Sequence, residues 1–433
     1  MERKEVLVKR GNPRQNVQLR LPSGLILSAP IGSTLEEIFT DAIDQRLIAF
    51  ESPLIAAVCD GKLRELTHAP QRDYDVRPIT GADSDGGRIY RRSLVLLMVT
   101  ALNELWRGTQ VRVNYAVRDG GFYCELANRE PLTKEQVTLL EGRMRKLVEE
   151  DHPIVRRSVS VAEAEDIFAS RDEYDTLRLL QFRSKENVPL YSLRGRPDYY
   201  FGYMVPSTRY LQTFKLIHMP DAFILQYPRR ESANELLPLR VYQKLSTVFQ
   251  QAGEWLERIE VEDIGQLNLL VQSDKIREII LVAEALHEQN VARIAQKIYA
   301  RMEQGTRIVL IAGPSSSGKT TFSKRLSIQL LALGVRPFTL EMDNYFVERH
   351  LTPRDENGEY DFEALEAMDR VILNDHLLRL MEGEEVQLPR FDFKSGTRQP
   401  GQTVRLAQNQ VVILEGIHGM NPDLLSRIPK DNI

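Results

Sequence analysis

Residues 308–320 read Ile-Val-Leu-Ile-Ala-Gly-Pro-Ser-Ser-Ser-Gly-Lys-Thr, a short apolar run followed by a glycine-rich loop. The loop has the spacing Gly-x-x-x-x-Gly-Lys-Ser/Thr, which is typical of loops that bind phosphate groups. The apolar run predicts a buried parallel strand over 308–312, and residues 321–331 favour a helix directly after the loop. Because the motif requires a strand before it and a helix after it, this context predicts a parallel α/β sheet in the C-terminal part of the chain.

Each part of the loop has a chemical role in this interpretation. Glycines permit backbone torsions that residues with a Cβ avoid, so the loop amides and the helix N-terminus can face an anion together. Lys319 would supply a charge to the β- and γ-phosphates of ATP, and the Thr320 hydroxyl would bind Mg²⁺. The alternative is a chance glycine–serine turn before a core helix, which the preceding strand disfavours. The predicted ATP site consists of Gly313, Ser315, Ser316, Ser317, Gly318, Lys319, Thr320 and Thr321.

Two carboxylates follow predicted strands further along the chain. Residues 335–340 predict a short strand that leads to Asp343, and residues 410–414 predict a buried strand that ends at Glu415. Open α/β sheets build their sites at such carboxyl ends. Asp343 could accept the proton of a substrate hydroxyl, although a helix N-cap is the alternative role. Glu415 occupies the place of a Walker-B acid, which can hold Mg²⁺ together with Thr320. The predicted catalytic residues are Lys319, Asp343 and Glu415.

Two further motifs lie between these strands. Gly358-Glu-Tyr-Asp-Phe362 is predicted to precede a helix containing Leu365, Met368 and Val371, and Leu388-Pro-Arg-Phe-Asp-Phe393 groups aromatic and acidic residues. Together with the loop and the strand ends, they make residues 305–420 resemble the uridine kinase and phosphoribulokinase family of P-loop kinases. By that resemblance Asp343 would be the general base for a sugar 5′-hydroxyl. The resemblance also implies a set of substrate-binding residues: Tyr360, Asp361, Phe391, Asp392 and Arg398.

The chain departs from that family in two places. A histidine with which family uridine kinases read the pyrimidine falls at Gly396, so the resemblance leaves the base open. The chain also ends at Ile433, before the further strands and the arginine-bearing lid of the family. Since lid arginines stabilise the charge of the transferred phosphoryl group, we expect a truncated kinase domain, either a fragment of a longer protein or a slow enzyme.

The first 82 residues alternate short strands with one helix. Strands are predicted over 17–21 and 25–27, then a helix capped by Ser33 and Thr34, then strands over 54–58 and 62–66. This order predicts a β-grasp module. Through Leu21–Gly24 and Ala56–Lys62 the segment resembles the TGS domain of threonyl-tRNA synthetases.

The resemblance to threonyl-tRNA synthetases continues over residues 83–228, into their α+β editing domain. It rests on the helix that opens at Arg88–Ser93, on Gly-Phe-Tyr at 121–123 and on Val-Pro-Ser-Thr at 205–208. The family carries a His-x-x-x-His pair, a cysteine and a third histidine. The matching positions here are Arg92, Leu96, Tyr200 and Met204, which cannot form a metal or general-base cluster of that kind. We therefore expect no zinc, and a domain that serves as a scaffold or contacts RNA.

Residues 229–303 predict a helical connector with a break near Asn290, because apolar residues keep helical spacing on either side of it. The predicted organisation is thus multidomain α/β and α+β. It comprises a TGS-like β-grasp domain over 1–82, an editing-like α+β domain over 83–228, a connector over 229–303 and a P-loop kinase domain with a parallel sheet over 304–433.

Composition sets outer limits on function. The chain has 433 residues, 42% of them hydrophobic and 27% charged, and a net charge of −4. This is ordinary for a soluble multidomain protein and does not by itself demand nucleic acid. Two cysteines imply no disulfide framework. No apolar run approaches the roughly 20 residues that span a bilayer, and Met1–Val6 lacks the apolar core of a signal peptide. We therefore expect a cytoplasmic protein with no membrane partner.

The sequence thus predicts an ATP-dependent, uridine kinase-like enzyme that phosphorylates a primary hydroxyl of a nucleoside. A kinase of another sugar or small alcohol remains an alternative, because Gly396 replaces the base-reading histidine. A different class of alternative is an RNA-binding or regulatory protein that uses a nucleotide as a switch. Homo-oligomerisation and the choice between ATP and GTP stay open.

Overall fold

The computed structural model describes residues 14–127, 129–240, 243–355 and 358–433, and the chain separates into two compact units, Met1–Asp274 and Lys275–Ile433. The segment Met1–Val6, on which the signal-peptide prediction depends, lies outside the described residues. The division into four domains stays a prediction. In the two-unit division, the last helix of the predicted connector belongs to the C-terminal unit.

The N-terminal unit opens with a five-stranded sheet in the order β2-β1-β5-β3-β4, in which β1 and β5 are parallel and the other described pairs antiparallel. A capping box begins the helix α1: Thr34 accepts from the Glu37 amide, and the Glu37 carboxylate accepts from the Thr34 amide. Ile38, Phe39 and Ala42 of α1 are buried on the sheet. The elements are β1 Asn16–Arg20, β2 Ile26–Pro30, α1 Leu35–Asp44, β3 Leu54–Cys59, β4 Lys62–Glu65 and β5 Tyr74–Thr80.

Two smaller sheets and the helices α2 to α7 complete the described part of this unit. A four-stranded sheet has the order β11-β12-β7-β6, and a three-stranded sheet has the order β10-β9-β8. The buried face of α2 shares one core with α3 and with β7, β9 and β12. The elements are α2 Ser84–Leu105, β6 Val111–Val117, β7 Gly121–Leu126, α3 Lys134–Glu149, β8 Ile154–Ser160, α4 Val161–Ala169, α5 Tyr174–Leu180, β9 Asn187–Leu193, β10 Arg196–Tyr199, η1 Thr208–Tyr210, β11 Lys215–His218, β12 Phe223–Gln226, α6 Gln243–Arg258 and α7 Ile264–Gln272.

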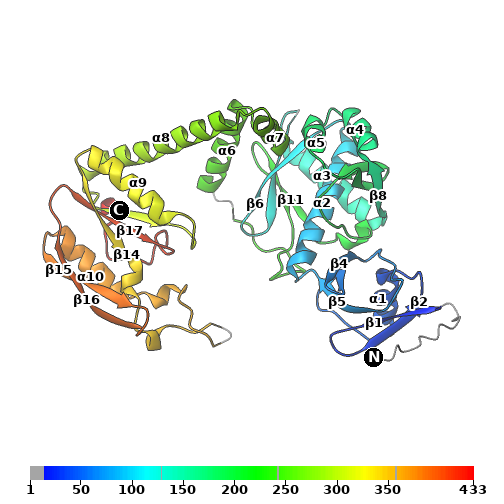
Figure 1. Ribbon diagram of the computed structural model, residues 1–433, viewed down its shortest axis with the longest axis horizontal. Helices are drawn as coiled ribbons and strands as arrows, with labels where there is room; N and C mark the ends of the chain where they lie inside the picture. The colour runs from blue at the N-terminus through cyan, green and yellow to red at the C-terminus, as the bar shows by residue number, and fades with distance from the viewer. Residues whose placement is uncertain (1–13, 128, 241–242, 356–357) are drawn as a thin grey trace, which may run out of the picture. The chain divides into compact units, whose positions relative to one another are not determined.

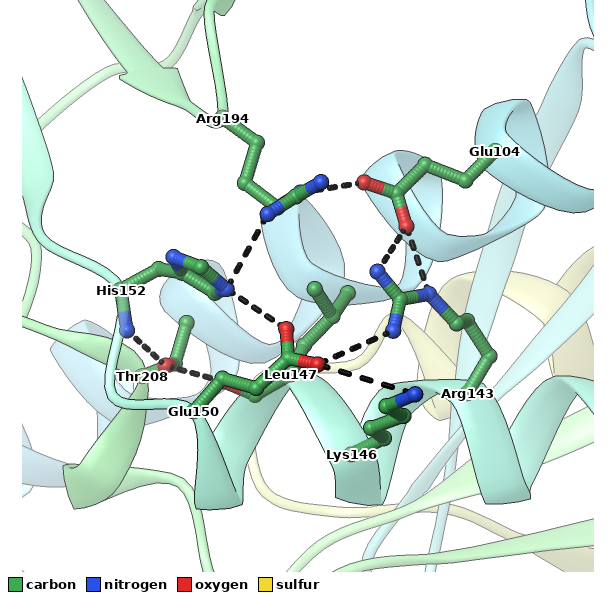
Figure 2. A network of polar contacts seen from close by, with 8 residues as sticks. All are labelled: Glu104, Arg143, Lys146, Leu147, Glu150, His152, Arg194 and Thr208. Atoms are coloured by element: carbon green, nitrogen blue, oxygen red, sulfur yellow. Dashed lines mark hydrogen bonds and ion pairs between the residues drawn. The ribbon is translucent and has the colours of Figure 1, made fainter.

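A polar network joins the ends of α2 and α3 to the β9–β10 turn (Figure 2). Glu104 at the end of α2 binds Arg143 of α3 at 2.5 Å and Arg194 of the turn at 2.6 Å. The amide of His152 donates to the Thr208 hydroxyl at 2.8 Å, and that hydroxyl donates to the Leu147 carbonyl at 2.6 Å. Because these groups are paired with one another, they act as a structural tie between the two helices and the turn.

The C-terminal unit is built on a parallel three-stranded sheet in the order β13-β17-β14 (Figure 1). Both faces are covered, as the apolar sequence of β17 predicts. Val412 and Leu414 of β17 face a core with α10, whereas Val411 and Ile413 face a core with α8 and α9. The elements are β13 Ile308–Ala312, α9 Lys319–Ala332, β14 Arg336–Glu341, η2 Met342–Tyr345, η3 Arg349–Leu351, η4 Leu365–Ala367, α10 Arg370–Met381, β15 Glu385–Asp392, β16 Thr397–Arg405, β17 Gln410–Gly416 and η5 Lys430–Asn432.

Two helix predictions in this unit were wrong in detail. The predicted break near Asn290 is absent, because α8 runs without interruption over Ile276–Met302. Arg325 of α9 pairs with Glu284 and Glu288, which precede Asn290 on α8. Val291 and Ala295, which follow it, are buried in a core shared with α9, so both parts of α8 pack against the same helix. Neither α8 nor another helix among the described residues is long and apolar enough to cross a membrane. The helix expected to contain Leu365, Met368 and Val371 is divided into η4 and α10, because Asp369 caps α10 by accepting from the Ile372 amide.

Candidate active site

Three parallel strands deliver the predicted catalytic residues to one edge of the C-terminal sheet. In the register of the sheet, Ile311 of β13 and Glu341 of β14 both lie opposite Glu415 of the central strand β17. The strands therefore end together. The loop to Lys319 leaves β13 at this edge, and η2 places Asp343 directly after β14. This is the carboxyl edge at which open α/β sheets bind their ligands.

The phosphate-type loop has the backbone that its glycines predict. A Cβ at Gly313 would lie 2.6 Å from the Ser317 hydroxyl and 3.3 Å from the Lys319 Cγ, so a larger residue would require these side chains to move. Gly318 has φ +84° and begins α9, and Ser316 has φ +59°. A non-glycine residue in the left-handed region costs about 1 kcal/mol and persists where the surrounding structure requires it. The loop therefore holds a specific shape.

Lys319 and Thr320 point to different partners at the start of α9. The Lys319 ammonium donates to the Pro314 carbonyl at 2.8 Å, so the side chain runs back along the loop. The Thr320 hydroxyl donates to Oε1 of Glu415. Oε2 of Glu415 is buried and has no hydrogen-bond partner among the described residues. A carboxylate oxygen left unpaired beside a hydroxyl is suited to a hard cation, because such cations prefer oxygen ligands.

Asp343 is open to the cavity, yet its pKa is raised above that of an ordinary aspartate. The main cause is the protein packed around the carboxylate, which removes part of its hydration, and the Glu415 carboxylate adds to the shift. The Lys319 ammonium opposes it. A carboxylate whose pKa is shifted towards neutrality binds a proton more strongly, so Asp343 has the property that a general base needs.

A cavity of about 1000 Å³ joins these groups to an aromatic wall. Residues 315–321, Asp343 and Glu415 line one part of it, and Phe346, Phe362, Phe391 and Phe393 line another. Phe346 meets Phe362, Phe391 and Phe393 edge to face, at centroid distances of 6.1, 5.8 and 6.2 Å. Such a wall suits a flat or apolar ligand group. The cavity thus places a polar, phosphate-type site beside an aromatic one.

Five of the residues predicted to bind ATP or substrate do not line this cavity: Gly313, Tyr360, Asp361, Asp392 and Arg398. Gly313 shapes the loop from behind. Asp361 accepts from the amides of Glu363 and Ala364, and Asp392 accepts from the Ser395 hydroxyl. Arg398 pairs with Asp369 at 2.8 Å, and Arg354 lies over the Tyr360 ring at 4.3 Å. In this structure these side chains shape turns and helix ends, and their substrate roles stay predictions.

Comparison with known proteins agrees with this geometry. Residues 308–426 match the model of the Phosphoribulokinase / Uridine kinase family. This segment is therefore similar to the kinases of that family. The solved structure of a "possible uridine kinase" from Bacillus stearothermophilus aligns with 27% sequence identity and a TM-score of 0.23, covering 28% of this chain and 71% of that chain.

The N-terminal half is similar to a different class of protein. Over 245 residues the chain is 31% identical to the threonine–tRNA ligases of Burkholderia lata and Burkholderia vietnamiensis, which covers 56% of this chain. The chain spans 37% of the length of these relatives. Both resemblances inferred from the sequence, to the kinase family and to threonyl-tRNA synthetases, are confirmed.

The synthetase-like half brings the replaced editing positions together. Arg92 of α2 donates to the Tyr203 carbonyl at 2.6 Å, and its guanidinium lies so close to Gly202 that a Cβ there would be 2.8 Å away. Leu96 and Met204 are almost fully buried in the same core. Among the residues that the structure describes, no group of three or more His, Cys, Asp or Glu is arranged to hold a metal ion.

Sequence reasoning missed several ionisable residues of this cavity, among them Arg349 and His418. His418 comes three residues after Glu415, just past the carboxyl end of β17, and that position was a usable signal. Arg349 carried no local signal. It reaches the cavity because its amide donates to the Gly396 carbonyl at 2.9 Å and its guanidinium donates to the Phe393 carbonyl, which joins η3 to the β15–β16 turn.

Arg349 also explains why glycine stands at position 396. Gly396 has φ +71°, and a Cβ there would lie 2.8 Å from the Arg349 Cβ and 2.9 Å from its Nε. The space that a side chain at 396 would fill is therefore taken by Arg349. The glycine at position 396 and the placement of Arg349 are two parts of one local arrangement.

We expect Gly396→His to loosen the β15–β16 hairpin. The new histidine should not take up a base-reading position. The left-handed backbone and the contact with Arg349 together cost about 1–2 kcal/mol, which corresponds to roughly tenfold faster amide exchange. Hydrogen exchange over residues 385–405 measures it. Arg349→Ala in the same chain should recover part of the protection, because it removes the steric share. Equal exchange in Gly396→His and the parent would contradict the packing argument.

Proposed function

We propose that the C-terminal unit is an ATP-dependent kinase that transfers the γ-phosphoryl group to a primary hydroxyl of a nucleoside-like acceptor. The observation that carries the proposal is the shared edge of β13, β14 and β17, which gathers Lys319, Asp343 and Glu415 around one cavity. A phosphate loop with a carboxylate base beside it and an aromatic wall opposite is the equipment for phosphorylating a small alcohol.

In this proposal the protein contributes one proton transfer and several positioning contacts. Asp343 takes the proton of the acceptor hydroxyl while the hydroxyl oxygen attacks the γ-phosphorus. The bond between that phosphorus and the β–γ bridging oxygen breaks, and ADP leaves. Lys319 would move from the Pro314 carbonyl to the phosphates, where its charge stabilises the transferred group.

The residues present fit Mg²⁺. Thr320 and Glu415 would hold it, because the hydroxyl and the carboxylate are already in contact and Oε2 of Glu415 has no other partner among the described residues. When bound with ATP, the ion would neutralise charge on the β- and γ-phosphates.

The acceptor class is supported by the aromatic wall. Stacking on a flat base is the interaction that edge-to-face phenylalanines around an open cavity offer, and Phe393 is 56% exposed. The full chain should be incubated with γ-labelled ATP and a panel of uridine, cytidine, adenosine, ribose and glycerol. We expect label on a nucleoside 5′-hydroxyl. Label on ribose or glycerol alone would favour the sugar or small-alcohol alternative, and ATP hydrolysis without any labelled acceptor would refute the kinase proposal.

The raised pKa of Asp343 gives a pH dependence with a definite sign. The base works only when ionised, so kcat/KM should rise with pH through the pKa of Asp343 and be lost below it. Because burial raises that pKa, the acid limb should lie above the pH of about 3.9 at which an ordinary aspartate titrates. A pH–rate profile under subsaturating acceptor measures it. A rate that stays constant from pH 8 to pH 4 would exclude Asp343 as the base.

The N-terminal unit supports a second function, contact with RNA. We infer that its first sheet and α1 form a TGS-like β-grasp and that residues 83–228 form an editing-like domain without its reactive side chains. The support is the 31% identity to threonine–tRNA ligases and the packing of Arg92 against Tyr203. Filter binding with tRNA at increasing salt tests it. Tight, salt-dependent binding that Lys319→Ala leaves unchanged is expected, and absence of binding at low salt would remove the proposal.

A further inference from the structure

His418 is a cavity residue whose side chain lacks a protein partner. It lines the same cavity as Lys319 and Thr320, yet its Nε2 atom is buried and makes no hydrogen bond within the described residues. Buried polar side-chain atoms in native proteins nearly always have a partner. An unpaired ring nitrogen on a residue that lines a ligand-sized cavity therefore points to a partner that a bound ligand would supply.

Two glycines fix the backbone on either side of His418. A Cβ at Gly416 would lie 2.7 Å from the Met342 sulfur, and a Cβ at Gly419 would lie 3.2 Å from the Ala312 Cβ and from the Ile311 carbonyl oxygen. The segment is thus packed between the end of β14 and the end of β13, where the phosphate-type loop begins. The backbone of His418 therefore lies beside the start of the phosphate-type loop.

The surroundings of His418 favour a phosphate over the acceptor as its partner. The neighbouring glycines pack on Met342 and on Ala312, the residue before the loop. The aromatic wall is built by Phe346 after η2, by Phe362, by Phe391 of β15 and by Phe393 after that strand. A histidine ring can donate an N–H, which an anionic phosphate oxygen accepts strongly. Lys319 already serves the same end of the cavity, so a second donor there would act on the same phosphate chain.

We propose that the Nε2–H of His418 donates a hydrogen bond to the terminal phosphoryl group of a bound nucleoside triphosphate, and so distinguishes triphosphate from diphosphate. The inference rests on the proposed kinase function and adds to it a residue that reads the length of the phosphate chain. A nucleoside diphosphate lacks that group and gains nothing from His418.

The test compares ATP and ADP binding to the full chain by calorimetry with Mg²⁺, in the parent, His418→Phe and His418→Gln. The phenylalanine ring keeps the bulk without the donor, and the glutamine amide keeps an N–H. A lost hydrogen bond to a charged group should weaken ATP binding about tenfold or more in His418→Phe and leave ADP binding within about twofold. His418→Gln should lie between that variant and the parent.

The ratio of the two affinities separates recognition from folding, because a merely structural defect would weaken both nucleotides together. Equal losses for ATP and ADP, or no loss, would overturn the inference while leaving the kinase proposal in place. If the parent binds neither nucleotide, the inference about His418 and the kinase proposal are both refuted. If His418→Phe does not fold, His418→Asn takes its place, because the shorter amide cannot reach the same point. An ATP-to-ADP affinity ratio equal to that of the parent would then overturn the inference.

Discussion

Replacing Asp343 with asparagine is expected to lower kcat for phosphoryl transfer by about 10²- to 10⁴-fold, the range that a positioned general base contributes. The amide keeps the size of the side chain and cannot take the proton of the acceptor hydroxyl. ATP binding should remain within about threefold, because Asp343 faces the transferred group in the proposed mechanism, and no hydrogen bond among the described residues joins its carboxylate to a loop amide. Single-turnover phosphorylation of the best acceptor and calorimetric ATP binding measure the two quantities.

Glu341→Gln is the matched control for Asp343→Asn. Glu341 ends the same strand, lines the same cavity and loses the same charge on conversion to the amide. If the effect at 343 comes from proton transfer, Glu341→Gln should change kcat by less than about threefold, the scale of a screened charge. Comparable losses in both variants would mean that the cavity needs negative charge in general, and Asp343 would lose its assigned role.

The parts of the kinase domain that the sequence predicts are those with local signals. The apolar runs 308–312 and 410–414 correspond to strands β13 and β17, and the glycine spacing corresponds to the loop after β13. Strand burial and loop chemistry are encoded within a few residues, so both can be predicted locally. The same local reading places Asp343 and Glu415 at strand ends. What it cannot supply is the strand order, because the central position of β17 depends on contacts between segments about 100 residues apart.

The second half of the cavity depends entirely on such contacts. Phe346, Phe362 and Phe393 belong to three segments, and nothing in any one of them indicates that their rings meet. The Arg349–Gly396 contact is similar, since the glycine alone reads as a turn residue. The break predicted near Asn290 failed for the opposite reason. A polar residue interrupted the apolar pattern, but α8 continues because α9 packs along it.

Lys319→Ala is expected to weaken ATP binding and to lower kcat/KM by about 10²- to 10³-fold, the loss seen when one preorganised charge-stabilising contact is removed. Among the described residues the ammonium donates one hydrogen bond, to the Pro314 carbonyl, and that carbonyl belongs to an exposed residue and can bind water once the side chain is gone. The variant should therefore keep the thermal stability of the parent. This combination of lost affinity and kept stability separates a ligand-binding lysine from one that holds the fold.

Lys324→Ala is the control for Lys319→Ala. Lys324 lies on the same helix and is exposed, and its substitution removes the same charge outside the cavity. Its ATP affinity should stay within about twofold of the parent, as expected for a solvated surface charge. Lys319→Arg keeps the charge, but the planar guanidinium cannot reproduce a compact ammonium between phosphates, so only partial activity should return. Full activity in Lys319→Ala would show that the loop holds phosphate through its amides alone, and the charge argument for Lys319 would then be wrong.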